Sequence, residues 1–105
     1  LLSLAKTAPL PAAPDNINLA WDGSLWIGAQ PKPLSLPLVQ RDPTRQAPSL
    51  VIRYVDQEGV ATPMTEIFAS KGDLISTSTV AAVSGSRLLI GALLDDRYLI
   101  CDLPG

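Results

Sequence analysis

The fold of this chain is decided by the stretch Ala13-Pro-Asp-Asn-Ile-Asn-Leu-Ala-Trp-Asp-Gly-Ser-Leu-Trp-Ile-Gly-Ala-Gln-Pro31. Within it, residues 16–21 alternate between apolar and polar side chains, which is the period of a β-strand. The pair Asp22-Gly23 follows, and residues 24–29 form an apolar return segment. Asp-Gly between two such segments is a strong signal for a hairpin turn. The stretch therefore predicts two antiparallel strands.

The same design returns 63 residues later. Ile27-Gly28-Ala29 matches Ile90-Gly91-Ala92 when the chain is shifted by 63 residues, which is 91 minus 28. Self-similarity at a fixed period, with paired short strands in each copy, is typical of stacked sheet units such as propeller blades. We therefore predict an all-β fold made of antiparallel four-stranded blades of a β-propeller, present only in part.

Turn residues divide the chain into short strands and leave no room for long helices, since it holds ten prolines and seven glycines. We expect strands at residues 16–21, 24–29, 49–56, 62–70, 78–83, 87–93 and 97–103, and a long proline-rich surface loop at residues 30–48. The whole chain, residues 1–105, then forms the C-terminal segment of a propeller. It comprises the end of one blade at residues 1–8, a full blade at about 16–70, and the first three strands of a closing blade at about 78–103.

Charge and side-chain inventory exclude several classes of function. A net charge of −2 without a basic cluster argues against binding to nucleic acid or an anionic membrane. No apolar run approaches the roughly 18–20 residues that span a bilayer. The chain has no histidine, which removes the usual general base near neutral pH and imidazole metal ligands. A single cysteine, Cys101, excludes an internal disulfide or a zinc cluster. The chain alone is therefore poorly equipped for catalysis.

The composition also indicates that the chain needs partners. A lone sheet with 47% hydrophobic residues would leave both of its faces apolar, whereas blades bury those faces against their neighbours. The first residue is Leu1 rather than methionine, which favours a fragment of something larger over a processed product. We expect either missing upstream propeller blades or self-association of copies around an axis to cover the open faces.

Four stretches, in order and in register, resemble the C-terminal part of the paraoxonase (arylesterase) family, within the senescence marker protein and gluconolactonase group of six-bladed propellers. They are Asp15 to Ile17 with Leu25 to Gly28, Leu50 to Val55, Glu66 to Ala69 with Lys71-Gly72, and Ser78 to Val83 with Leu88 to Gly91 and Tyr98 to Cys101. The ending Cys101-Asp102-Leu103 also follows the family pattern. The resemblance covers nearly the whole chain and less than half of the family's full length.

Members of this family are calcium-dependent hydrolases of lactones and esters, and the resemblance places Asp15 and Asn16 at a calcium-ligand position. Both offer the hard oxygen atoms that calcium prefers, although it takes six to eight of them. From the residues alone, Pro-Asp-Asn is better explained as a turn that begins a strand.

The resemblance further places Gln30, Thr79 and Leu93 near the substrate mouth. For Gln30 the family pattern often has a histidine, which puts an acid–base role there in doubt. Without the resemblance, all three are ordinary strand-end residues. The resemblance also implies that Cys101 forms a disulfide with a segment absent from this chain, and the alternative is a buried strand thiol.

Two classes of function follow. The first is a C-terminal fragment of a calcium-dependent hydrolase of lactones or aryl esters, inactive by itself, that contributes part of the calcium site and the substrate mouth. The alternative is a non-catalytic propeller segment with a binding or structural role. We expect Asn18 to face the central tunnel as a spectator, and Trp21 and Trp26 to pack within the sheet. The compartment stays open, with a secreted or periplasmic location among the options.

Overall fold

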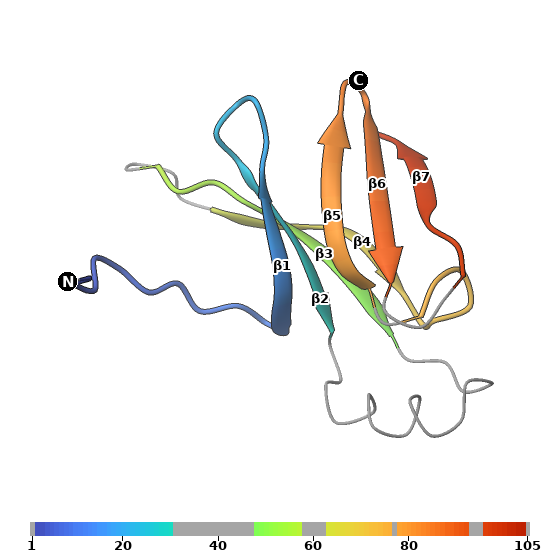
Figure 1. Ribbon diagram of the computed structural model, residues 1–105, viewed down its shortest axis with the longest axis horizontal. Helices are drawn as coiled ribbons and strands as arrows, with labels where there is room; N and C mark the ends of the chain where they lie inside the picture. The colour runs from blue at the N-terminus through green and yellow to red at the C-terminus, as the bar shows by residue number, and fades with distance from the viewer. Residues whose placement is uncertain (1, 31–47, 58–62, 77, 93–95, 105) are drawn as a thin grey trace.

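Seven short strands form two antiparallel sheets in the computed structural model, which describes residues 2–30, 48–57, 63–76, 78–92 and 96–104 (Figure 1). Sheet A has the order β1-β2-β3-β4 and sheet B the order β5-β6-β7. The strands are β1 Ala13–Leu19, β2 Leu25–Gln30, β3 Ser49–Tyr54, β4 Met64–Ser70, β5 Ser78–Ser84, β6 Arg87–Ala92 and β7 Leu99–Asp102. Within the described ranges there is no helix, so the predicted all-β fold of partial blades is confirmed.

The predicted hairpin joins β1 to β2 through a turn that begins at Ala20. The Ala20 N–H donates to the Ser24 carbonyl at 2.8 Å, and Gly23 adopts a φ of 85°, which glycine tolerates without steric cost. The Asp22 carboxylate accepts from both the Ser24 N–H and the Ser24 hydroxyl. This turn ends β1 at Leu19 and starts β2 at Leu25, which places Trp21 at the hairpin tip.

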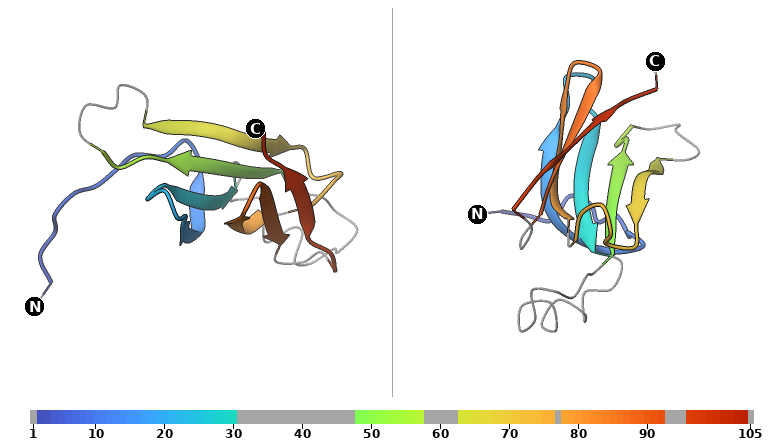
Figure 2. Two further views of the ribbon diagram at one scale, coloured as in Figure 1. Left: turned by 90° about the horizontal axis from the view of Figure 1, so that it is seen from above. Right: turned by 90° about the vertical axis from the view of Figure 1, so that its right-hand side faces the viewer.

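Sheet B packs against one face of sheet A, as Figures 1 and 2 show. The core between the two sheets consists of buried apolar side chains from both sheets and from the connection between β4 and β5: Trp26, Val51, Ile75, Ala81, Leu88 and Ile90. Gly28 permits this approach, because a methyl group placed on it would lie 2.5 Å from the Thr79 carbonyl carbon. The packing of blade against blade therefore depends on a bare backbone at Gly28.

The other face of sheet A carries a second cluster made of Ile27, Ala29, Leu50 and Ile52. The N-terminal segment covers part of this face through Leu10 and Ala12, on the side of β1 away from sheet B (Figure 1). Residues 2–8, expected to end a preceding blade as the tail of a strand, form no strand, and their place in such a blade stays a prediction. Ile17 and Leu19 remain 55% and 73% exposed on β1, which leaves the face partly open.

The two tryptophans have different environments, which corrects one expectation. Trp26 is buried in the core between the sheets, as expected, and its indole N–H donates to the Ser24 hydroxyl at 3.0 Å. Trp21 is 89% exposed at the hairpin tip, so the prediction that it packs within the sheet is wrong. By strand alternation Trp21 falls on the same face as Ile17 and Leu19, and these two residues are themselves exposed, so this face does not bury it.

Candidate functional site

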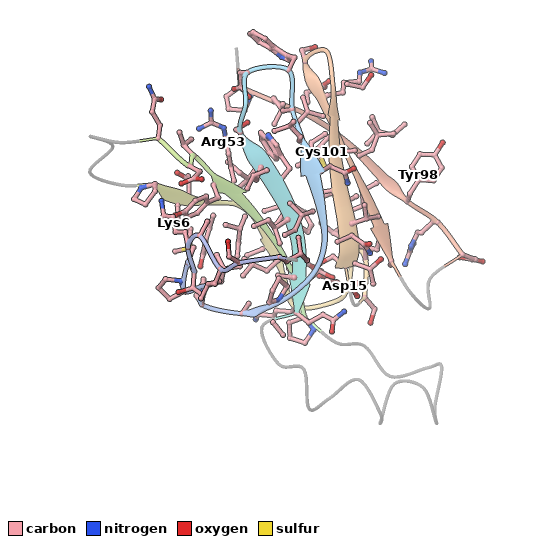
Figure 3. The ribbon with its side chains drawn as sticks, turned by 60° about the vertical axis from the view of Figure 1, so that its left-hand side comes forward. Lys6, Asp15, Arg53, Tyr98 and Cys101 are labelled. Carbon is pink, nitrogen blue, oxygen red and sulfur yellow. The ribbon has the colours of Figure 1, made fainter. Side chains whose placement is uncertain are left out.

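Two bulges at the same end of the two sheets build the candidate site. The register between β1 and β2 shifts between Pro14 and Ile17, and the register between β5 and β6 shifts between Ser78 and Val80. A bulge redirects side chains and is over-represented next to functional sites. The first bulge contains Asp15 and Asn16, and the second contains Thr79. Figure 3 shows Asp15 at one end of the sheets, with Arg53 towards the opposite end.

Hydrogen bonds of the Asn16 side chain join the two bulges. Its amide nitrogen Nδ2 donates to Asp15 Oδ1 and to the Thr79 carbonyl, each at 3.0 Å. Both donors of the amide are thereby engaged, which turns its oxygen Oδ1 away from these two acceptors. Asp15 and Asn16 are both exposed, so the amide oxygen and the carboxylate are available to a ligand from the solvent side.

These two side chains fit calcium as part of a site. They offer one carboxylate and one amide oxygen, the hard donors that calcium takes, against the six to eight that it requires. No group of three or more His, Cys, Asp or Glu side chains that could hold a metal ion occurs within the described residues. Further oxygen ligands are therefore required, and backbone carbonyls, water or residues outside the described part of the chain are the groups that would supply them.

Gln30 lies at the end of β2, opposite Ala13 on β1. By strand alternation its side chain shares a face with Trp26 and Gly28, which is the face that meets sheet B. Gln30 is 7% exposed, and its amide nitrogen Nε2 is buried without a hydrogen-bond partner among the described residues. A buried amide donor without a partner is costly, so this atom is a candidate contact for a ligand.

Of the three residues expected at the substrate mouth, the structure brings one, Thr79, into contact with the Asp15-Asn16 pair. Thr79 is half-buried and its carbonyl accepts from Asn16. Leu93 lies outside the described residues. Cys101 is a half-buried thiol on β7, opposite Leu88 on β6. Its disulfide to an absent segment therefore stays a prediction.

The sequence interpretation missed the polar residues that join the two sheets behind this site. Asn18 donates to the Ala81 carbonyl at 2.9 Å between the sheets, and its expected place as a spectator facing the tunnel stays a prediction. Ser49 and Ser78 are fully buried and hydrogen-bonded to each other. The 63-residue repeat could have predicted the two asparagine contacts, because each joins residues 63 positions apart.

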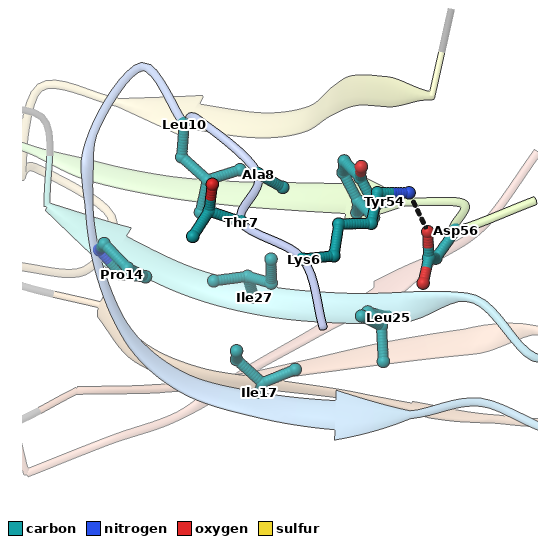
Figure 4. Close-up of a pocket in the computed structure, with 10 residues that line it drawn as sticks. All are labelled: Lys6, Thr7, Ala8, Leu10, Pro14, Ile17, Leu25, Ile27, Tyr54 and Asp56. Atoms are coloured by element: carbon teal, nitrogen blue, oxygen red, sulfur yellow. Dashed lines mark hydrogen bonds and ion pairs between the residues drawn. The ribbon is translucent and has the colours of Figure 1, made fainter. Parts of the chain in front are cut away.

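A separate pocket of about 310 Å³ lies on the other face of sheet A, under the N-terminal segment (Figure 4). It is lined largely by apolar side chains, Ile17, Leu25 and Ile27 among them. At its rim Lys6 forms an ion pair with Asp56, and this bond together with the carboxylate charge raises the pKa of Lys6. Both partners are mostly exposed, so the pair contributes little to stability. The lining offers a surface for packing rather than a group for catalysis.

Comparisons with known proteins settle the family. The family model for Arylesterase matches residues 1–103. The chain belongs to the arylesterase family. It is 30% identical over 103 residues to serum paraoxonase/arylesterase 2 of Gallus gallus and to that of Homo sapiens, and 27% identical to that of Rattus norvegicus.

Each of these alignments covers 97% of this chain and 28% of the relative, so the chain spans little more than a quarter of their length. The predicted resemblance to the C-terminal part of this family is confirmed as family membership. Among the described residues, no helix has the length and apolar character needed to span a membrane.

Proposed function

We propose that this arylesterase-family chain is the C-terminal part of a calcium-dependent hydrolase of lactones and aryl esters. In this proposal it contributes part of the calcium site and one wall of the substrate mouth. The observation that carries the proposal is the meeting of two bulges, where Asn16 ties Asp15 to Thr79. Asp15 and Asn16 present an exposed carboxylate and amide on the edge strand β1, at the end where the two bulges meet.

Asp15 and Asn16 are the residues that would hold calcium, through one carboxylate and one amide oxygen. The chemistry that calcium supplies in such a site is polarisation of the carbonyl that is to be attacked. The hydrogen bonds of Asn16 fix its amide plane, so its oxygen is oriented before any ligand arrives. Preorganised ligands of this kind reduce the cost of binding.

Gln30 would act on the substrate as a hydrogen-bond donor. Its buried Nε2 has no acceptor among the described residues, and an ester or lactone oxygen would supply one. An amide is not basic near neutral pH, because its nitrogen lone pair is delocalised into the carbonyl, so Gln30 is not the general base. The sequence contains no histidine, the commonest general base, and we propose that the base comes from outside this chain or is a water activated there. Thr79 would form the adjoining wall, and Leu93 is proposed to lie beside it.

Neighbouring blades would cover the open faces. Leu25 and Ile27 on sheet A stand 63 residues before Leu88 and Ile90, which pack against sheet A. Equivalent residues are expected to have equivalent neighbours in a stack of repeats. We therefore propose that the face of sheet A bearing Leu25 and Ile27 packs on upstream blades or on another copy of the chain.

The absence of histidine from the sequence favours a second candidate, a non-catalytic propeller segment with a binding or structural role. The two candidates differ in what Asp15 does. In the hydrolase it binds calcium, whereas in a structural blade it only begins a strand.

The experiment compares Asp15→Ala with the unsubstituted protein, carrying whatever upstream segment its gene encodes. We expect calcium affinity and hydrolysis of phenyl acetate to fall together by at least about tenfold, the lower end of what even outer-sphere substitutions cost a metal site. The matched control is Asp102→Ala, which removes an exposed carboxylate paired with Arg87 and should leave both unchanged. Unchanged calcium affinity in Asp15→Ala would show that the pair only forms the β1 bulge and binds no calcium. The 105 residues alone should bind calcium weakly, because most of the oxygen ligands are missing.

A further inference from the structure

Hydrogen bonds that cross between the two sheets hold the Thr79 bulge on both of its sides. On one side, β1 and β5 belong to different sheets, yet Asn16 and Asn18 donate to the Thr79 and Ala81 carbonyls at 3.0 and 2.9 Å. Donors two residues apart thus meet acceptors two residues apart. Between two strands of one sheet, backbone N–H groups donate to such carbonyls. Here the side-chain amides of Asn16 and Asn18 are the donors.

On the other side, the hydroxyl of Ser78 enters the hydrogen-bond ladder between β2 and β3. Ala29 and Leu50 are register partners in that ladder. The Leu50 N–H donates to Ser78 Oγ at 3.0 Å, and Ser78 Oγ lies 2.9 Å from the Ala29 carbonyl oxygen, with the Leu50 carbonyl at 3.2 Å as a second acceptor. A residue of sheet B therefore bridges two strands of sheet A.

Ser49, on β3 of sheet A, also holds Ser78 in position through a hydrogen bond. The Ser78 N–H donates to Ser49 Oγ at 3.1 Å, and the Ser49 hydroxyl donates to the Ile75 carbonyl at 2.7 Å. Both serines are fully buried. Buried polar groups are costly unless every one is satisfied, and a satisfied buried network selects one arrangement of its elements. Sliding sheet B along sheet A would break these bonds together.

We propose that Ser78 and Asn18 are positioning residues that hold the Thr79 bulge against the Asp15-Asn16 bulge. The inference rests on the proposed function for its significance, since it states how this chain fixes the spacing of its calcium and substrate residues. Ser78 precedes Thr79 and Ala81 follows it by two residues, and both are hydrogen-bonded to sheet A. These bonds fix the position of the Thr79 carbonyl relative to Asn16. Neither Ser78 nor Asn18 is expected to touch calcium or substrate itself.

The test observes the side-chain amide of Asn16 by nitrogen-15 nuclear magnetic resonance, in the protein with whatever upstream segment its gene encodes. In Ser78→Ala and in Asn18→Ala we expect the Asn16 amide signal to shift, and its response to added calcium chloride to require about 10–100-fold more calcium, the range typical of outer-sphere substitutions. Ser78→Thr keeps the hydroxyl and should restore both readouts.

The matched control is Ser24→Ala, because Ser24 is also a buried, hydrogen-bonded serine but lies in the hairpin turn at the other end of sheet A. It should lower the melting temperature while leaving the Asn16 signal in place. If Ser78→Ala and Asn18→Ala behave like Ser24→Ala, the two residues are only structural and the proposal is overturned. If calcium leaves the Asn16 signal of the unsubstituted protein unmoved, the calcium assignment fails, while the signal shifts in the variants still decide the positioning role.

Discussion

Replacing Gly28 with alanine tests whether the close approach of the two sheets holds the fold together. The added methyl carbon would lie 2.5 Å from the Thr79 carbonyl carbon and 2.8 Å from the Thr79 oxygen. These are backbone atoms, so no side-chain rotation can relieve the clash. Carbon atoms prefer separations of about 3.5–4.0 Å, so β5 has to move away from β2 by roughly 1 Å.

The cost of that movement has two parts. Overpacking of a close-packed interior costs about 1–3 kcal/mol. Displacing β5 also stretches the bonds from Asn16 and Asn18 to the Thr79 and Ala81 carbonyls, at about 1 kcal/mol each. Alanine recovers about 0.5–1 kcal/mol of backbone entropy relative to glycine. We expect a net destabilisation of about 2–4 kcal/mol, a large fraction of the roughly 5–15 kcal/mol that stabilises a typical domain.

The matched control is Gly91→Ala, at the position 63 residues further along. There the added carbon would lie 2.8 Å from a methyl group of the Val80 side chain, and no backbone atom comes as close. A rotation of Val80 relieves the contact for about 0.5–1.5 kcal/mol, which the gain in backbone entropy largely offsets. Thermal unfolding at a fixed protein concentration measures both variants, and about 2–4 kcal/mol corresponds to a fall of roughly 8–30 °C in melting temperature for a domain of this size. The reasoning is refuted if Gly28→Ala melts at or above Gly91→Ala.

Two further predictions concern acid stability and association. Bonds from the Ser24 hydroxyl and N–H, with Arg53 at 3.2 Å, lower the pKa of Asp22 to about 2 from 3.8. The ionised Asp22 therefore contributes its full stabilisation above about pH 4, and this contribution is lost as the pH falls towards 2. Denaturant unfolding should show that the difference in free energy of unfolding between the unsubstituted protein and Asp22→Asn narrows over this pH range. A difference that stays constant with pH would contradict this prediction. The 105 residues alone should self-associate, because Leu19 and Ile100 are 73% and 54% exposed, and each forfeits about 1.5–3 kcal/mol of burial. In sedimentation at micromolar concentration, the double variant Leu19→Lys/Ile100→Lys should contain more monomer than the unsubstituted chain. If the unsubstituted chain is a cooperatively folding monomer, the prediction of self-association is wrong.

The strands were predictable because their patterns are local. All seven expected strands are found. The first of them, β1, begins at Ala13 rather than at the expected Asn16. The sequence assigned Pro14 to a rigid connector, since proline lacks the N–H that a sheet ladder uses. In the structure Pro14 pairs with Ala29 at the outer edge of sheet A, the position where a strand tolerates proline.

Local patterns predict the positions of the candidate site residues along the chain, but not their contacts or burial. The Pro-Asp-Asn motif shows that oxygen atoms occur at the start of a strand, but it does not show what Asn16 contacts. Neither does it show that Gln30 is buried with an unpartnered Nε2, because burial depends on sheet B lying over β2. The buried contact of Ser78 with the β2–β3 ladder likewise involves residues about 28 and 49 positions away, and no local pattern encodes these distances.

The repeat contains more information than the strand pattern does. The first strands of neighbouring blades lie side by side, so residues separated by one repeat face each other, as Asn16 faces Thr79 and Asn18 faces Ala81 across 63 positions. The same rule shows why the calcium ligands proposed here are incomplete. One repeat before Asn16 falls before residue 1, so no residue of this chain can occupy the equivalent place on the other side of β1. We therefore expect further oxygen ligands from another blade, beside backbone carbonyls and water, whether an upstream segment or a second copy supplies that blade.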